Sequence, residues 1–298
     1  YNRARPSTTI PNTTATIQER RSDQRYGDLI VIESNANAYY DAFVASMDKR
    51  LSNGLTFRVN YAFGKNLDTG GDYTNTATGV EKPPETGTST CEICDYNSDK
   101  KGLSLFDTTH AFAVSYSYTL PFFSGATGLK KALFSGWQIS GLTSLQSGTP
   151  YHMHTGSDGP GLGNVDGWGQ DRPNIKDPSL LGKSFDDPDT SPILLGAASC
   201  TRVAGGFSGT YIDCPAFDTN IPLGGRGNIG MNVFRKDGTN NYNVAFGKTF
   251  PMPGGRERSL AFRGEFINFF NHAQFDKPNV QISGNIFGQI TNTANKGR

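Results

Sequence analysis

Hydrophobic and polar residues alternate strictly along two segments of the chain. In Leu55–Gly64 every second residue is large and apolar, and the residues between are polar or small. His110–Leu120 repeats the pattern, with Phe112, Val114 and Tyr116 separated by alanine and serine. A period of two residues is typical of a β-strand whose two faces meet different environments. The sequence therefore predicts a strand at each segment.

Four further segments follow the same alternation less strictly. They are Phe43–Asp48, Trp137–Gln146, Tyr242–Phe250 and Leu260–Phe266. Strands of globular proteins average about 5–6 residues, whereas strands that cross a bilayer need about 9–11. With the first two, these segments make six predicted strands of around ten residues each, which is the membrane-spanning length.

The connections between the predicted strands alternate between short and long. In order they are Leu51–Gly54, Lys65–Thr109, Pro121–Ser135, Thr149–Asn240 and Pro251–Arg258. The first carries Asn-Gly, a strong hairpin signal, and the fourth is about ninety residues rich in Gly, Pro, Asp and Asn without a sustained period. Compact soluble domains rarely contain such loops, whereas outer-membrane barrels have short periplasmic turns and long extracellular loops. We therefore expect the second and fourth connections to be extracellular and to face a ligand.

The two faces of the predicted strands differ in a way that favours a membrane barrel. One face is aromatic, and the other is mostly Ala, Ser, Gly and Asn, whereas a soluble sandwich would carry more Lys and Glu there. We interpret the aromatic face as lipid-facing and the few charges of the second face, Arg58, Arg263 and Glu265, as lumen-facing. Aromatic residues near strand ends are predicted to form interfacial girdles: Tyr39, Tyr40, Phe122, Phe123, Trp137, Phe269 and Phe270. The competing interpretation of these rings is the core of a soluble protein.

Composition removes several other classes of protein. The 28 basic and 27 acidic residues give a net charge of +1, so no electrostatic argument favours a nucleic-acid partner. The 20 Phe, 12 Tyr and 2 Trp are too many for a disordered chain. No apolar window approaches the roughly 18 residues that a membrane helix needs, which excludes a helical membrane bundle. The fold class expected is all-β, an antiparallel meander forming part of a transmembrane outer-membrane β-barrel.

The four cysteines fall in the two long connections. Cys91 and Cys94 form a CxxC pair, and Cys200 and Cys214 lie fourteen residues apart. A zinc site would need further ligands at suitable spacing, and a thioredoxin-like motif would need a strand-to-helix context. We favour two local disulfides, Cys91–Cys94 and Cys200–Cys214, in an oxidising compartment.

The remaining candidate chemistry is weak. His152 and His154 could present two imidazoles to a metal, with Asp158 and Asp166 nearby, although a polar rim at a strand end explains them more simply. Gly225–Gly230 matches a dinucleotide fingerprint but lacks the strand and helix that such a site requires. No catalytic constellation is present, so we expect no enzyme activity and no cofactor.

Six phrases occur in an order that resembles one family. They are Tyr39–Gly54 (YYDAFVASMDKRLSNG), Leu55–Asp68 (LTFRVNYAFGKNLD), Phe106–Phe122 (FDTTHAFAVSYSYTLPF), Gly136–Pro150 (GWQISGLTSLQSGTP), Gly227–Asn232 (GNIGMN) and Leu260–Phe275 (LAFRGEFINFFNHAQF). Together they resemble the C-terminal part of the barrel of Oar-like TonB-dependent outer-membrane receptors, which carry a carboxypeptidase-regulatory-like domain at the N-terminus. The resemblance runs from about Gln18 to Arg298.

The resemblance implies a barrel of about 22 strands, an N-terminal plug and a TonB box. We expect residues 1–298 to be a C-terminal barrel segment without the plug, because six strands are fewer than the eight of a closed barrel. Gly288–Arg298 would lead into a last strand that is missing. The implied partners are outer-membrane lipid, the TonB complex through the missing N-terminal parts, and a small-molecule, glycan or peptide substrate. The alternative is a secreted all-β binding module such as a glycan-binding sandwich.

Overall fold

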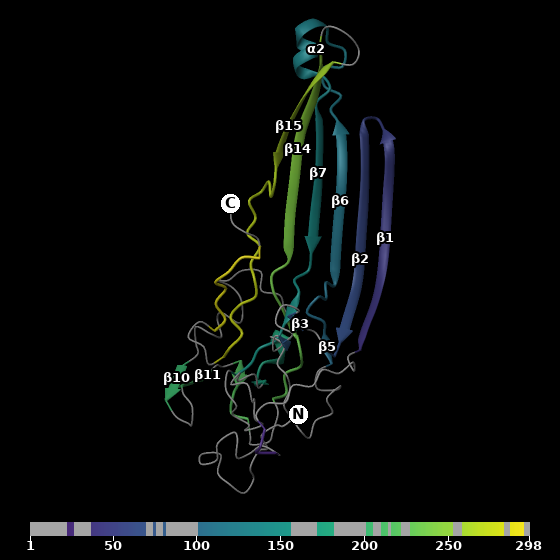
Figure 1. Cartoon of the computed structure of the whole chain (residues 1–298). Coiled ribbons are helices and arrows are strands. Elements are labelled where there is room, and N and C mark those ends of the chain that lie inside the picture. The colour runs from purple at the N-terminus through teal and green to yellow at the C-terminus, as the bar shows by residue number, and fades with distance from the viewer. Residues whose placement is uncertain are drawn as a thin grey trace.

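The structure is a computed structural model that describes residues 23–26, 37–69, 74–75, 80–81, 101–155, 172–181, 201–204, 210–213, 216–221, 227–252, 258–282 and 287–294. Its main feature is a set of six long strands that run side by side (Figure 1). They are β1 (Ala38–Ser52), β2 (Leu55–Asp68), β6 (His110–Thr119), β7 (Gln138–Gln146), β14 (Thr239–Pro251) and β15 (Ser259–Phe266). Each predicted segment coincides with one of them, so the strand prediction is confirmed.

The six strands form one antiparallel meander. Their order in the sheet is β1-β2-β6-β7-β14-β15, which is their order along the chain, and the two-residue strand β5 (Gly102–Leu103) adds to the end of β2. Among the described residues, β1 and β15 each pair with only one neighbour. The sheet is therefore open at both edges rather than closed into a barrel.

The register places most of the large apolar side chains of the six strands on one face, with Tyr40, Val44 and Leu142 as exceptions on the other. Phe57 lies opposite Tyr116, and Tyr118 lies opposite Ile139, which in turn faces Phe246. This aromatic face comprises Phe43, Met47, Phe57, Val59, Tyr61, Phe63, Phe112, Val114, Tyr116, Tyr118, Ile139, Leu145, Tyr242, Val244, Phe246, Phe250, Leu260, Phe262 and Phe266. The opposite, polar face comprises Ser46, Asp48, Thr56, Arg58, Asn60, Ser115, Ser117, Ser140, Ser144, Asn241, Asn243, Arg263 and Glu265.

Apolar residues of the aromatic face remain exposed in the chain alone. Phe43 is 63% exposed and Phe262 is 53% exposed, and almost every residue of β1 is exposed. A contiguous exposed apolar surface of this kind is unfavourable in water and is normally covered by another protein or by lipid. The sheet thus has no core of its own, which is the property expected of strands that meet lipid.

A glycine on the aromatic face is covered by a facing ring. Gly141 lies directly opposite Tyr116, and a Cβ added to it would be 2.6 Å from the Tyr116 hydroxyl and 2.7 Å from the Asn243 carbonyl oxygen. The ring fills the space that a side chain would occupy, so that the tyrosine and the glycine form one packing unit across the two strands.

Three short connections lie at one end of the sheet, which we call the short-turn end. Asn53 and Gly54 join β1 to β2 with φ of 51° and 76°, the left-handed pair that Asn-Gly hairpins require. The connection between β6 and β7 contains α2 (Gly128–Phe134), a short helix at the same end of the sheet (Figure 1). The sequence analysis predicted no helix there. No helix among the described residues is long and apolar enough to cross a membrane.

The hydrophobic core of the described residues lies at the opposite, long-loop end. This loop core consists of Tyr151, Met153, Leu180, Ala216, Phe217, Ile229, Phe234, Ile282 and Phe287. Within it β8 (Pro150–Tyr151) pairs with β13 (Phe234–Arg235), β9 (Asn174–Ile175) pairs with β12 (Phe217–Asp218), and a single 3-10 turn covers Pro178–Leu180. The short strands β3 (Thr74–Asn75) with β4 (Val80–Glu81) and β10 (Thr201–Ala204) with β11 (Thr210–Asp213) form separate ribbons. The fourth connection, which showed no period in sequence, thus contains ordered structure.

Candidate functional site

The polar face of the sheet carries hydrogen bonds between small side chains of neighbouring strands. The Ser46 hydroxyl donates to the Asn60 side-chain oxygen at 3.0 Å, and the Gln138 amide donates to the Ser117 hydroxyl at 2.5 Å. The two side chains of each pair satisfy each other's hydrogen-bonding groups without a charged partner. The face is therefore rich in short polar side chains, opposite in character to the aromatic face.

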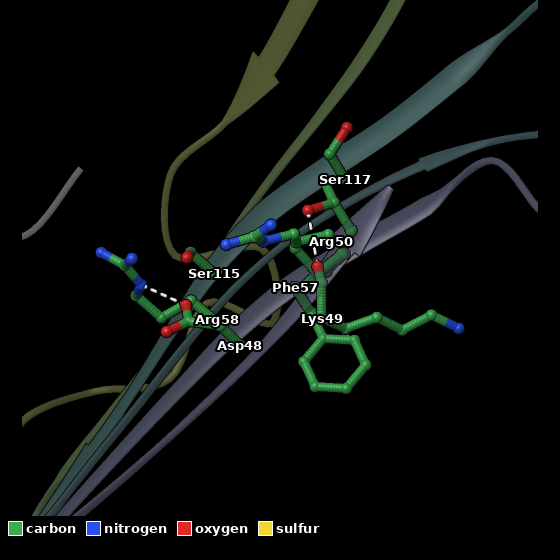
Figure 2. A pocket seen from close by; sticks show the side chains of 9 residues that line it. Asp48, Lys49, Arg50, Phe57, Arg58, Ser115 and Ser117 are labelled. Carbon is green, nitrogen blue, oxygen red and sulfur yellow. Dashed lines mark hydrogen bonds and ion pairs between the residues drawn. The ribbon is translucent and has the colours of Figure 1, made fainter. Parts of the chain in front are cut away.

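The predicted lumen residue Arg58 lies on this polar face. Its guanidinium Nε donates to the Asp48 carboxylate at 2.5 Å across β1 and β2 (Figure 2). The two side chains are 64% and 53% exposed, so water screens the ion pair strongly. We conclude that the pair orients two charges on an open surface and contributes little to stability.

An open pocket of about 600 Å³ surrounds that ion pair at the short-turn end. Among its described lining residues Lys49, Arg50 and Arg58 are cations and Asp48 is the only carboxylate (Figure 2). The rest of the lining is Thr56, Phe57, Ser115, Tyr116 and Ser117. Volumes of roughly 300–1,000 Å³ are typical of ligand sites. The excess of cations over carboxylates makes the pocket suited to a polar solute that carries negative charge.

The other two predicted lumen residues pair with each other along one strand. Arg263 and Glu265 both lie on the polar face of β15, and Arg263 Nε contacts Glu265 Oε1 at 2.5 Å. Both side chains are more than half exposed. The sequence analysis predicted that both charges face the lumen, and the described ion pair runs along the strand between residues two positions apart.

A buried ion pair fastens the loop core to the sheet. Arg235 Nη2 contacts Asp107 Oδ2 at 2.5 Å, and these side chains are only 12% and 1% exposed. Asp107 also accepts a hydrogen bond from the backbone N–H of Asn66 at 2.6 Å, and the Thr109 hydroxyl reaches it at 3.3 Å. Arg235 donates in addition to the Gly148 carbonyl at 2.9 Å. One carboxylate therefore joins the ends of β2 and β6 to β13.

A second link lies beside the first. The Asn232 side-chain amide donates to the Leu103 carbonyl of β5 at 2.6 Å. The backbone of Met231 passes so close to Gly102 that a Cβ added to the glycine would lie 2.5 Å from the Met231 Cβ. Only a glycine fits at that position, which fixes the loop core against the extended end of β2.

His152, one of the two weak metal candidates, is a core residue. It is only 2% exposed, and its Nε2 has no hydrogen-bond partner among the described residues. Burial lowers the pKa of the imidazole to about 3, and the neighbouring His154, Arg172 and Lys277 lower it further, while a hydrogen bond with Asn232 raises it. The imidazole is therefore neutral at physiological pH.

The structure brings the two histidines near each other without completing a metal site. Their ring centroids are 6.4 Å apart, and the backbone N–H of His154 donates to the Val280 carbonyl at 3.1 Å. No cluster of three or more His, Cys, Asp or Glu residues occurs in the part of the chain that the structure describes. Asp158 and Asp166, which the sequence analysis considered as further ligands, lie outside the described residues.

The predicted disulfides fall outside the described residues as well. Cys91, Cys94, Cys200 and Cys214 all belong to segments that the structure does not describe. Both pairings remain predictions.

The predicted girdle aromatics occupy the two ends of the sheet. Tyr39 and Tyr40 begin β1 at the long-loop end, where Phe270 also stacks edge-on against Tyr242, with ring centroids 5.0 Å apart. Phe269 donates its backbone N–H to the Tyr242 carbonyl at 2.7 Å, so it belongs to the same end. Phe122, Phe123 and Trp137 flank α2 at the short-turn end.

Sequence reasoning missed three functional features of the molecule. They are the Asp107–Arg235 ion pair, the helix α2, and Lys248 on the aromatic face. The ion pair joins residues 128 positions apart, so no local pattern reveals it. Lys248 interrupts the apolar alternation of Tyr242–Phe250, and this interruption was the one signal that could have directed attention to it.

Comparison with known proteins gives one match. A family model described as "Outer membrane beta barrel domain" matches residues 1–298. No curated protein and no solved structure matches the chain. The match agrees with the meander order and the two unlike faces of the sheet, and it confirms the predicted fold class.

Proposed function

The chain belongs to the outer membrane beta barrel domain family, and from this premise we propose that it forms part of the wall of a TonB-dependent transport barrel. Its location is the bacterial outer membrane. In this proposal the long loops capture a solute and the polar face of the sheet lines the path through the membrane. Coupling to the TonB complex rests on the resemblance of the six sequence phrases to Oar-like receptors.

The observation that carries the proposal is the difference between the two faces of the sheet. The aromatic face requires a covering phase, and lipid is the phase that an outer-membrane barrel offers. The polar face must then point inward, where its short hydroxyl and amide side chains leave room for water and solute. Asp48 and Arg58 on this face supply fixed charges beside an open pocket.

The loop core supports the capture step. Outer-membrane barrels carry their long loops on the extracellular side, and here those loops are packed around buried Phe217, Phe234 and Met153. Two links, through Asp107 and Asn232, hold this core against the sheet. A folded and fastened loop layer presents binding groups with less loss of conformational entropy than free loops would.

Uptake measurements in the native host test the proposal. A deletion strain and the same strain complemented with the gene would receive labelled iron chelate, cobalamin, oligosaccharide or peptide. Each solute would be tested with and without a protonophore that collapses the inner-membrane proton gradient. We expect one solute class to accumulate only in the complemented strain and only while the gradient persists. Accumulation that continues after the gradient collapses would refute TonB dependence.

A pair of neighbouring substitutions tests the assignment of the faces. Arg58→Gln removes a charge from the polar face, and Val59→Ala changes the next residue, which lies on the aromatic face and does not line the pocket. We expect the first to alter the uptake rate and the second to leave it unchanged. An effect of Val59→Ala alone would reverse the assignment.

The alternative of a secreted all-β binding module has lost its main support. It required the aromatic residues to form a soluble core, but those of the sheet are exposed or half-buried, and none belongs to the core cluster of the described residues. The family location in the outer membrane also favours the barrel.

A further inference from the structure

The helix α2 carries an exposed apolar surface at the short-turn end. Leu129 and Leu133, four residues apart and so on one side of the helix, are 74% and 45% exposed, and Phe134 is 53% exposed. Phe122 and Phe123 lie just before the helix in sequence and are also exposed. None of the residues of α2 is buried in the chain. A seven-residue helix of this kind is not held by its own propensity, so other contacts must fix it.

Those contacts attach α2 to the aromatic face of the sheet. The Trp137 indole N–H donates to the Leu133 carbonyl at 3.0 Å, and the Trp137 ring stacks edge-on against Phe262 with centroids 6.0 Å apart. The Lys248 ammonium donates to the Ser135 carbonyl directly after the helix. Lys248 and Phe262 lie opposite each other on the aromatic face, and Trp137 directly precedes β7.

Among the described residues, Lys248 is held there by aromatic rings, with no carboxylate in ion-pair contact. Its Nζ lies 5.0 Å from the Phe250 ring centroid and 5.8 Å from that of Trp137. Only 6% of the residue is exposed. The ammonium points toward Ser135 at the end of the sheet. The charge of this lysine on the lipid-facing side thereby reaches the membrane–water interface.

The charge of the α2 segment is entirely positive. Leu120–Trp137 contains Lys130 and Lys131 and no Asp or Glu, and both lysines are exposed. Lysines beside an apolar surface at the membrane boundary are attracted to anionic headgroups, while the apolar side chains enter the acyl region.

We propose that α2 is an interfacial anchor that binds the phosphate groups of anionic phospholipids in the leaflet at the short-turn end, through Lys130 and Lys131, with Leu129, Leu133 and Phe134 inserted between the acyl chains. The surface is continuous with the lipid-facing aromatic face through Trp137 and Phe262, which is why the occupant is the bilayer rather than a protein. The inference rests on the membrane location of the family and is independent of which solute the barrel carries.

Trp137 provides a reporter beside the proposed contact. The chain has 2 tryptophans, so Trp168→Phe leaves Trp137 as the single tryptophan, which can be excited selectively over tyrosine. The protein would be reconstituted in mixed phosphatidylcholine and phosphatidylglycerol vesicles, with one lipid at a time carrying bromine on its acyl chains. Bromine quenches only nearby indoles, so the ratio of the two quenching curves measures enrichment of the anionic lipid at Trp137.

We expect stronger quenching by brominated phosphatidylglycerol, with an enrichment of about fivefold per lysine at low salt that falls as salt is raised. Lys130→Gln together with Lys131→Gln should bring the ratio close to one. The matched control is Lys65→Gln, an exposed lysine at the opposite end of β2, which should leave the ratio unchanged.

Three results would overturn the proposal. Equal quenching by the two lipids would exclude a preference for anionic headgroups, and absence of quenching by either would place Trp137 away from lipid. A preference that survives the double lysine substitution would assign it to other residues. The two lysines are exposed and lie in α2 rather than in a strand, so we expect their substitution to leave the strand pairing intact and the readout interpretable.

Discussion

Removal of the Arg235 guanidinium should open the loop core while leaving the sheet paired. In Arg235→Met the Asp107 carboxylate, 1% exposed, loses its cation and keeps only the hydrogen bonds with Asn66 and Thr109. Loss of one partner of a buried ion pair costs about 3–5 kcal/mol, and the two remaining hydrogen bonds favour the lower end. A change of about 3 kcal/mol in the local opening free energy multiplies the open population by roughly a hundredfold or more.

Hydrogen–deuterium exchange of the protein in phospholipid vesicles measures this opening directly. Peptides that cover β8 and β13 should exchange roughly a hundredfold faster in Arg235→Met, while peptides from β7 and β14 should keep their protection. Arg58→Met is the matched control, because it breaks an ion pair whose partners are 64% and 53% exposed, and exposed pairs contribute at most about 1 kcal/mol.

A second variant separates charge from shape. Asp107→Asn combined with Arg235→Met removes both charges but keeps a side-chain oxygen for the Asn66 N–H, so most of the protection should return. Acceleration of less than about fivefold in Arg235→Met would refute the reasoning. So would a double variant that exchanges as fast as the single one, because the unpaired charge would then not be the cause.

Three further outcomes follow from other parts of the molecule. Gly141→Ala should lower the free energy of unfolding by about 1–3 kcal/mol in urea titration, because the new Cβ would overlap a carbonyl oxygen at 2.7 Å, whereas Gly264→Ala, with no atom nearer than 3.9 Å, should have a much smaller effect. The imidazole of His152 has a pKa of about 3 in the folded loop core but takes up a proton near pH 6.5 when the core is unfolded. Protonation therefore favours the unfolded core, and the free energy of unfolding of the loop core should fall by about 2 kcal/mol between pH 7 and pH 5. Exchange rates corrected for intrinsic pH effects should show this loss, and a His152→Asn variant that keeps the same pH slope would contradict it. Mass spectrometry of unreduced peptides should find Cys91–Cys94 and Cys200–Cys214 linked, and free thiols or exchanged partners would show the pairing to be wrong.

The strands could be predicted because, in an alternating segment, the polarity of each side chain indicates the face of the strand on which it lies. Phe57 and Arg58 are neighbours in sequence and opposite in orientation, and this requires nothing beyond extended backbone geometry. The order of the strands in the sheet could be predicted from the short connections between them, since Asn53-Gly54 closes a tight hairpin between β1 and β2. The register across β7 and β14, by contrast, spans the longest connection and came only from the structure.

The loop core could not be predicted because its members have no common period. Met153, Phe217, Phe234 and Ile282 are isolated apolar residues in polar segments, brought together by packing between distant parts of the chain. Helix α2 was missed for a related reason, since seven residues are too few to show a 3.6-residue repeat. The sites that were missed are those in which tertiary contacts, rather than neighbours in sequence, define the environment.

The pairing of β8 with β13 has a consequence for how the protein folds. It lies next to the ladder between β7 and β14, and the Lys236 N–H donates to the Thr149 carbonyl between the two at 3.1 Å. Closing a loop of about ninety residues costs roughly 3 kcal/mol more in chain entropy than closing one of about four. Because the loop core lies outside the strands that meet lipid, this entropy can be lost in water. We therefore expect β7 and β14 to meet the membrane already joined as a hairpin, with the slowest search completed where the backbone is hydrated.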